Sequence, residues 1–83
     1  MTKKWYIEKT GIEADIIYWW KKGNHGYTPD IKEAKVFTEE KAKEICSQIY
    51  TDKRRWPKKY IDNKIIHRVN KEDCNYDDVL DDL

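Results

Sequence analysis

The sequence has few of the residues from which metal sites and disulfide frameworks are usually built. Its 83 residues include two histidines, His25 and His67, and two cysteines, Cys46 and Cys74. Zinc ligands must reach one ion at about 2.0–2.3 Å, so a zinc site normally uses closely spaced His or Cys pairs. Neither pair here is closely spaced. We therefore expect no metal, no cofactor and no disulfide framework.

The sequence also lacks the local patterns of an activated nucleophile or a phosphate-binding loop. Ser47 is its only serine, and it falls inside an expected helix without a neighbouring base. Neither the glycine pattern of dinucleotide-binding loops nor that of P-loops occurs. The carboxylates lie on a helix surface or in an acidic run, not as a pair with contrasting environments. We expect a protein without enzymatic activity.

Long hydrophobic runs are absent. No stretch approaches the roughly 18 apolar residues of a membrane-spanning helix. The opening residues MTKKWY also lack the apolar run of about 7–15 residues found in a signal peptide. We expect a cytoplasmic protein that has no membrane contact.

Charged residues and large aromatics are abundant instead. Charged residues make up 40% of the chain and nearly cancel, at net charge +1, and there are four tryptophans and six tyrosines. A chain this short forms one domain with a small core, in which buried aromatics supply much of the apolar area. The balanced charge argues against a protein that coats DNA, because such domains are usually clearly basic.

The order of hydrophobic patterns predicts an α+β fold. Residues 4–9 and 15–21 are expected to form an antiparallel hairpin, and residues 64–69 a third strand. Residues 39–50 are expected to form the main helix, with Thr38 as its N-cap. The predicted sheet thus has about three strands packed on one helix, in the order β-β-α-β. Residues 1–70 form the expected domain, and residues 71–83 form an acidic tail that is partly ordered at best.

The predicted helix has one apolar face, which is expected to pack on the sheet. Its members recur at helical spacing and are Ala42, Ile45, Cys46, Ile49 and Tyr50. Pro57 prevents this helix from continuing through to Tyr60.

Two adjacent tryptophans suggest a contact surface. On a strand, Trp19 and Trp20 face opposite sides of the sheet, and one helix covers only one side. We therefore expect one of them, with Tyr6 or Tyr18, on an open face that binds another protein or a second copy of the chain. The alternative is that residues 29–37 or the acidic tail cover that face.

A basic segment and an acidic segment offer two further candidate contacts. In the basic segment, cations alternate with rings, which suits single-stranded nucleic acid or an acidic partner: Lys53, Arg54, Arg55, Trp56, Lys58 and Lys59. The alternative is a solvated connection with Trp56 packed on the helix end. The acidic segment is either a solvated tail or a contact for a basic partner, through Asp77, Asp78, Asp81 and Asp82.

Residues 26–42, GYTPDIKEAKVFTEEKA, resemble a pattern in small proteins encoded by phages and prophages. That pattern is an aromatic hairpin, a GYT or GWT turn, an acidic turn ending in Ala, and Phe-Thr before a helix. It is carried by Gly26, Tyr27, Thr28, Asp30, Ala34, Phe37, Thr38 and Ala42. The resemblance spans residues 5–49 and implies an α+β fold and a phage source. It also implies a role in binding and disabling a host enzyme or bacterial defence complex, as anti-CRISPR proteins do. It implies no active site.

Overall fold

The computed structural model describes residues 3–12, 14–24, 26–47, 52–64 and 69–83. Within these ranges the strands are β1 (Lys4–Lys9), β2 (Tyr18–Trp20), β3 (Tyr27–Thr28), β4 (Phe37–Thr38) and β5 (Lys53–Pro57). The α-helices are α1 (Glu39–Cys46) and α2 (Lys58–Asp62). Short 3-10 helices are η1 (Lys22–Asn24), η2 (Ile31–Glu33), η3 (Lys71–Asp73) and η4 (Tyr76–Asp82).

Strand β1 lies at the centre of an antiparallel sheet. It pairs with β5 over residues 5–9, with β2 at Glu8 and Lys9, and with β4 at Lys4 and Trp5. Glu8 and Lys9 pair with both β5 and β2, and Trp5 pairs with both β5 and β4. Since a residue pairs with one strand on each side, β2 and β4 lie along the edge of β1 opposite to β5. Strand β3 then pairs with β2. The predicted α+β class is confirmed, but two additional short strands precede α1, so the simple β-β-α-β order is wrong.

The predicted hairpin is confirmed, with a shorter second strand. β1 has the expected bounds and pairs antiparallel with β2, but β2 covers Tyr18–Trp20 and not all of residues 15–21. The preceding residues have a different partner. The main-chain nitrogen of Ile17 donates to the oxygen of Val69 at 2.8 Å, and Lys71 donates to the oxygen of Asp15 at 2.7 Å.

The basic segment forms a strand that the sequence reading missed. Residues 53–57 are β5, and α2 follows directly, with Pro57 at its N-cap position. Interpreting residues 53–59 as a solvated connection was therefore wrong, because pairing with β1 supplies an order that the local sequence does not signal. Of the predicted strand at residues 64–69, residues 65–68 lie outside the described residues, and Lys64 lies in the turn after α2.

Helix α1 begins where the sequence predicts. The main-chain nitrogen of Lys41 donates to Oγ1 of Thr38 at 3.3 Å, so Thr38 is the N-cap. The helix is described to Cys46, and residues 48–50 of the predicted helix lie outside the described residues. Ala42 is fully buried, whereas Ile45 and Cys46 are only half-buried. The helix thus packs on the sheet chiefly through Ala42.

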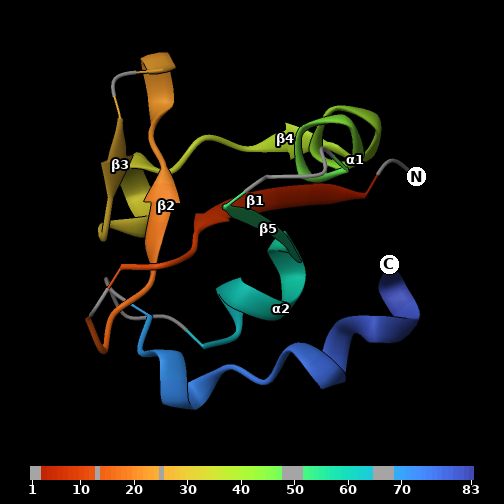
Figure 1. The fold of residues 1–83 in the computed structure, drawn as a ribbon. Coiled ribbons are helices and arrows are strands. Elements are labelled where there is room, and N and C mark those ends of the chain that lie inside the picture. Colours follow the sequence, from red (N-terminus) through yellow and green to blue (C-terminus); the bar gives the residue numbers. More distant parts are fainter. Residues whose placement is uncertain (1–2, 13, 25, 48–51, 65–68) are drawn as a thin grey trace.

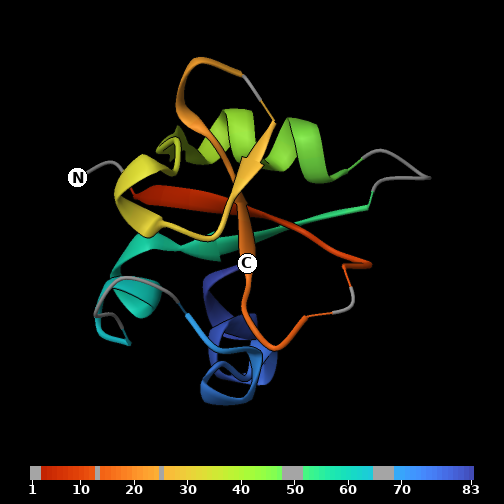
Figure 2. The ribbon, with the colours of Figure 1, turned by 90° about the vertical axis from the view of Figure 1, so that its left-hand side faces the viewer.

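Both faces of β1 are covered, so the face that carries Tyr6 and Trp19 is not open. Figures 1 and 2 show α1 on one side of the sheet and α2 with the C-terminal segment on the other. The α1-side core consists of Trp5, Ile7, Phe37 and Ala42. The α2-side core consists of Tyr6, Ile17, Trp19, Ile31, Ala34, Trp56, Ile61, Val69 and Val79.

Residues 71–83 lie against the rest of the chain. Val79 on η4 is 1% exposed and belongs to the α2-side core. This segment therefore covers the same face of the sheet as α2. The domain boundary at residue 70 stays a prediction.

Candidate protein-binding surface

The β2–β3 hairpin presents two large rings side by side. Trp20 pairs with Tyr27 across the two strands, and their ring centroids lie 6.4 Å apart in an edge-to-face arrangement. The connection between them is tight because Gly23 and Gly26 adopt positive φ values of 75° and 90°. Trp20 is half-buried and rests edge-on against Phe37, at 5.5 Å between centroids. Tyr27 is 39% exposed.

A lysine from β5 completes this surface. Nζ of Lys53 lies 5.5 Å from the centroid of Trp20 and 5.6 Å from that of Tyr27, within the range of a cation–π contact. We call Trp20, Tyr27 and Lys53 the hairpin patch. The same ammonium donates to Oδ1 of Asp52 at 2.9 Å. That hydrogen bond is the main cause of a raised pKa for Lys53, so the patch keeps its positive charge.

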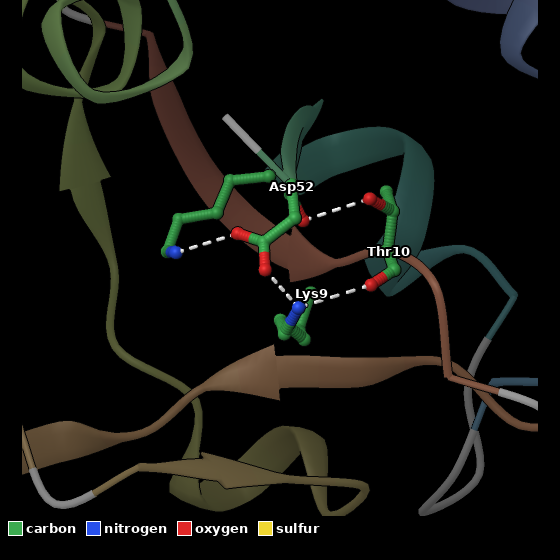
Figure 3. Close-up of polar contacts among 4 residues, drawn as sticks. Lys9, Thr10 and Asp52 are labelled. Atoms are coloured by element: carbon green, nitrogen blue, oxygen red, sulfur yellow. Dashed lines mark hydrogen bonds and ion pairs between the residues drawn. The ribbon is translucent and has the colours of Figure 1, made fainter. Parts of the chain in front are cut away.

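Asp52 fixes the position of Lys53 and of the sheet edge beside it. Figure 3 shows its carboxylate next to Lys9 and its main-chain oxygen next to Thr10. Lys9 donates to the second carboxylate oxygen, while the nitrogen and Oγ1 of Thr10 donate to the main-chain oxygen at 2.7 and 2.8 Å. Hydrogen bonds from Lys9 and then from Lys53 lower the pKa of Asp52 to about 2. The carboxylate is therefore ionised at neutral pH and holds two cations together.

Two of the four aromatics predicted to bind protein are inside the molecule. Trp19 is fully buried and Tyr6 is 5% exposed, because the α2-side core covers the face that they share. The Tyr6 hydroxyl donates to Oδ1 of Asp62 at 2.8 Å, and burial followed by this bond raises the pKa of Tyr6. Tyr18 is half-buried. Of the adjacent tryptophans, Trp20 is thus the accessible one.

Most of the basic segment is engaged within the chain. The Arg54 guanidinium lies 4.6 Å from the centroid of Tyr76, and the Arg55 guanidinium lies 5.3 Å from that of Trp5. Nη2 of Arg55 also donates to the main-chain oxygen of Leu83 at 3.3 Å. These contacts place the two arginines on opposite faces of the sheet.

The remaining basic-segment residues have contrasting surroundings. Trp56 is buried, and its Nε1 donates to Oε1 of the buried Glu8 at 2.8 Å. Lys58 donates to Oδ2 of Asp62 at 2.5 Å. Lys59 is exposed. The enclosed Trp56 offers no ring on which a base could stack.

The acidic residues lie on the outside of η4. Asp77, Asp78 and Asp81 are exposed, and the side chain of Asp82 lies outside what the structure describes. Oδ2 of Asp78 accepts from the Tyr60 hydroxyl at 2.8 Å. We call residues 76–83 the acidic strap. It begins with Tyr76 against the α2-side core and ends with Leu83 against the α1-side core, so it passes around β5, the outermost strand on that side.

The sequence reading missed Tyr27 and the role of Lys53. In the sequence, Tyr27 is part of a turn signature and Lys53 is one charge in a run, and their meeting depends on two distant strands. In the described part of the chain, no group of three or more His, Cys, Asp or Glu side chains is arranged to hold a metal ion. His25 and His67 lie outside the described residues. None of the helices described has the length and apolar character that crossing a membrane requires.

Comparison with protein-family models, curated proteins and solved structures found no match to this chain.

Proposed function

We propose that this chain is a non-enzymatic protein-binding module whose contact surface is centred on the hairpin patch. One observation carries the proposal. Trp20 and Tyr27 remain accessible next to each other, whereas the other three tryptophans, Trp5, Trp19 and Trp56, are buried. Tryptophan and tyrosine are enriched among the residues that dominate binding energy at protein interfaces.

The geometry of the hairpin patch favours binding without large reorganisation. Phe37 supports Trp20 from within the core, and strand pairing sets the position of Tyr27. Rings that are already held in place lose little side-chain freedom when a partner covers them. The Lys53 ammonium adds positive charge, which favours a partner surface with acidic groups around an apolar centre.

The partner class in this proposal comes from the resemblance to small phage proteins. A protein of this kind acts stoichiometrically, by occupying a surface that a host enzyme or defence complex needs. The chain would then work as an inhibitor or adaptor in the cytoplasm of a bacterial host. Nucleic-acid binding through residues 53–59 is the weaker alternative, because Trp56 is enclosed and Arg54, Arg55 and Lys58 have partners within the chain.

Affinity capture with matched variants tests the proposal. Wild-type chain, Tyr27→Ala and Leu80→Ala are immobilised and exposed to a bacterial lysate, and the retained proteins are quantified by mass spectrometry. Leu80 is the control because it is also exposed, at 52%, but lies on η4. A partner of the hairpin patch is retained by wild type and Leu80→Ala and lost from Tyr27→Ala. Recovery of the same proteins by all three baits would contradict the proposal.

A further inference from the structure

The outer edge of β5 has main-chain groups that the sheet does not use. Thr10 and Asp52 are opposite each other, and the nitrogen of Thr10 donates to the oxygen of Asp52. In an antiparallel ladder, hydrogen-bonded pairs alternate with non-bonded ones. When this alternation is followed along the register of β1 and β5, Ile7 and Arg55 form a non-bonded pair. The N–H and C=O of Arg55 therefore point away from β1. Pro57 also falls at a non-bonded position, where its missing N–H costs nothing.

The acidic strap crosses this edge without pairing with it. Its two ends lie on opposite faces of the sheet, so the turn at residues 80–82 passes outside β5. The strap is 3-10 helical over Tyr76–Asp82, and no described residue bonds to the main chain of Arg55 from outside the ladder. Covering an edge strand in this way prevents uncontrolled strand pairing. The main-chain N–H and C=O of Arg55 would become available if residues 80–82 moved away from this edge.

The far end of the strap has a weak hold. Val79 is buried and anchors the middle of the strap, but Leu80 is 52% exposed and Asp81 is exposed. Beyond them, Leu83 is half-buried and its main-chain oxygen accepts one hydrogen bond from Arg55, at 3.3 Å. Leu83 also packs against the α1-side core, and its main-chain nitrogen donates to the oxygen of Leu80 at 3.2 Å. Leu80, Asp81 and Leu83 are therefore less buried than Val79.

We propose that the outer edge of β5 binds an extended acidic peptide segment of a partner protein by strand addition, in competition with residues 80–83 of the acidic strap. Main-chain bonds to Arg55 would supply the register, as in other cases where a peptide extends a sheet. Charge complementarity selects the occupant. Arg54 and Lys59 are exposed, opening of residues 80–83 releases the Arg55 guanidinium from Leu83, and the segment that now covers this edge is acidic. This site is separate from the hairpin patch.

The probe is a short fluorescein-labelled peptide of alternating Glu and Thr, titrated into the full chain and followed by fluorescence anisotropy. Two peptides of the same length serve as controls: one with Lys in place of Glu, and one N-methylated at alternate residues. Strand addition predicts that the acidic peptide binds at least about tenfold more tightly than either control. It also predicts slower hydrogen exchange of the Arg55 amide in the complex.

Two leucine variants test the competition with the strap. Leu83→Ala weakens the attachment of residues 80–83 and should tighten peptide binding at least about threefold. The reason is that the state in which these residues have left the edge of β5 becomes more populated. Leu80→Ala, which removes an exposed side chain from the same turn, should leave it unchanged, as should Tyr27→Ala in the hairpin patch. The proposal is overturned by equal binding of the N-methylated peptide, or by no binding to Leu83→Ala. It is also overturned if oligothymidylate, and not the peptide, binds that variant.

Discussion

Arg54 and Arg55 are neighbours in β5, yet they contact opposite ends of one segment from opposite faces of the sheet. Arg54 lies over the ring of Tyr76, and Arg55 donates to the main-chain oxygen of Leu83. Adjacent residues on a strand point to opposite sides, so a segment held by both must pass around the strand's edge. Strand β5 and the acidic strap thereby lie against each other.

Val79→Ala should destabilise the whole domain. Val79 is 1% exposed, and removing its two methyl groups from the core should cost about 2 kcal/mol of unfolding free energy. The measurement is urea denaturation followed by tryptophan fluorescence. Leu80→Ala, at a side chain 52% exposed, should stay within about 0.5 kcal/mol of wild type. Equal, negligible effects of both variants would show that residues 71–83 are only loosely attached.

The buried pair of Glu8 and Trp56 gives a second prediction. Trp56→Phe removes the Nε1–H donor that lies 2.8 Å from Oε1 of Glu8, and leaves the carboxylate in the core without it. We expect a loss of about 1–3 kcal/mol in unfolding free energy. Glu8→Gln keeps an acceptor for the indole and should cost less. Unchanged denaturation of Trp56→Phe would mean that the bond contributes nothing to stability.

The lowered pKa of Asp52 predicts a specific dependence of stability on pH. Its pKa is about 2 in the folded chain, against about 3.9 for an unperturbed aspartate. A carboxylate whose pKa is lower in the folded state stabilises the fold at pH values above its pKa in the unfolded state. This contribution disappears as the pH falls through the pKa of the folded state. Asp52→Asn should therefore lower the melting temperature at pH 6, with the difference from wild type shrinking between about pH 4 and pH 2.

The control for this experiment is Asp15→Asn, at another exposed aspartate. It should change the melting temperature little at any pH in the same range. A difference between wild type and Asp52→Asn that stays constant down to pH 2 would contradict an ionic role for the carboxylate.

We predict that the chain does not bind single-stranded nucleic acid. Because Trp56 is enclosed and four of the five cations in residues 53–59 have partners within the chain, oligothymidylate should show no saturable binding at low salt. Anisotropy of a labelled oligonucleotide measures this directly. Binding that weakens steeply with added salt, and weakens again in Arg54→Glu and Lys59→Glu, would favour the nucleic-acid alternative.

Local signals were sufficient to predict part of this fold. The bounds of β1 and the N-cap at Thr38 follow from residues close together in the sequence. Strand β5 could not be predicted in the same way. Its sequence is dominated by cations, and its conformation depends on pairing with a strand more than forty residues earlier.

The sequence alone also could not show which tryptophan belongs to the candidate surface. Strand alternation places Trp19 and Trp20 on opposite faces but does not say which face is covered. That depends on α2 and η4, which contribute Ile61 and Val79 to the core that encloses Trp19. Once this cover is known, Trp20 is the accessible ring, and its neighbour Tyr27 becomes part of the surface.

The most direct test of the protein-binding account is site-specific photo-crosslinking from the hairpin patch. A photoreactive phenylalanine replaces Tyr27 in one chain and Leu80 in another, and each is irradiated in a bacterial lysate. The account predicts a discrete adduct from position 27 that excess unlabelled wild-type chain suppresses and excess Trp20→Ala chain does not. It predicts no such adduct from position 80. Absence of a competed adduct at position 27, or equal suppression by Trp20→Ala, would contradict the account.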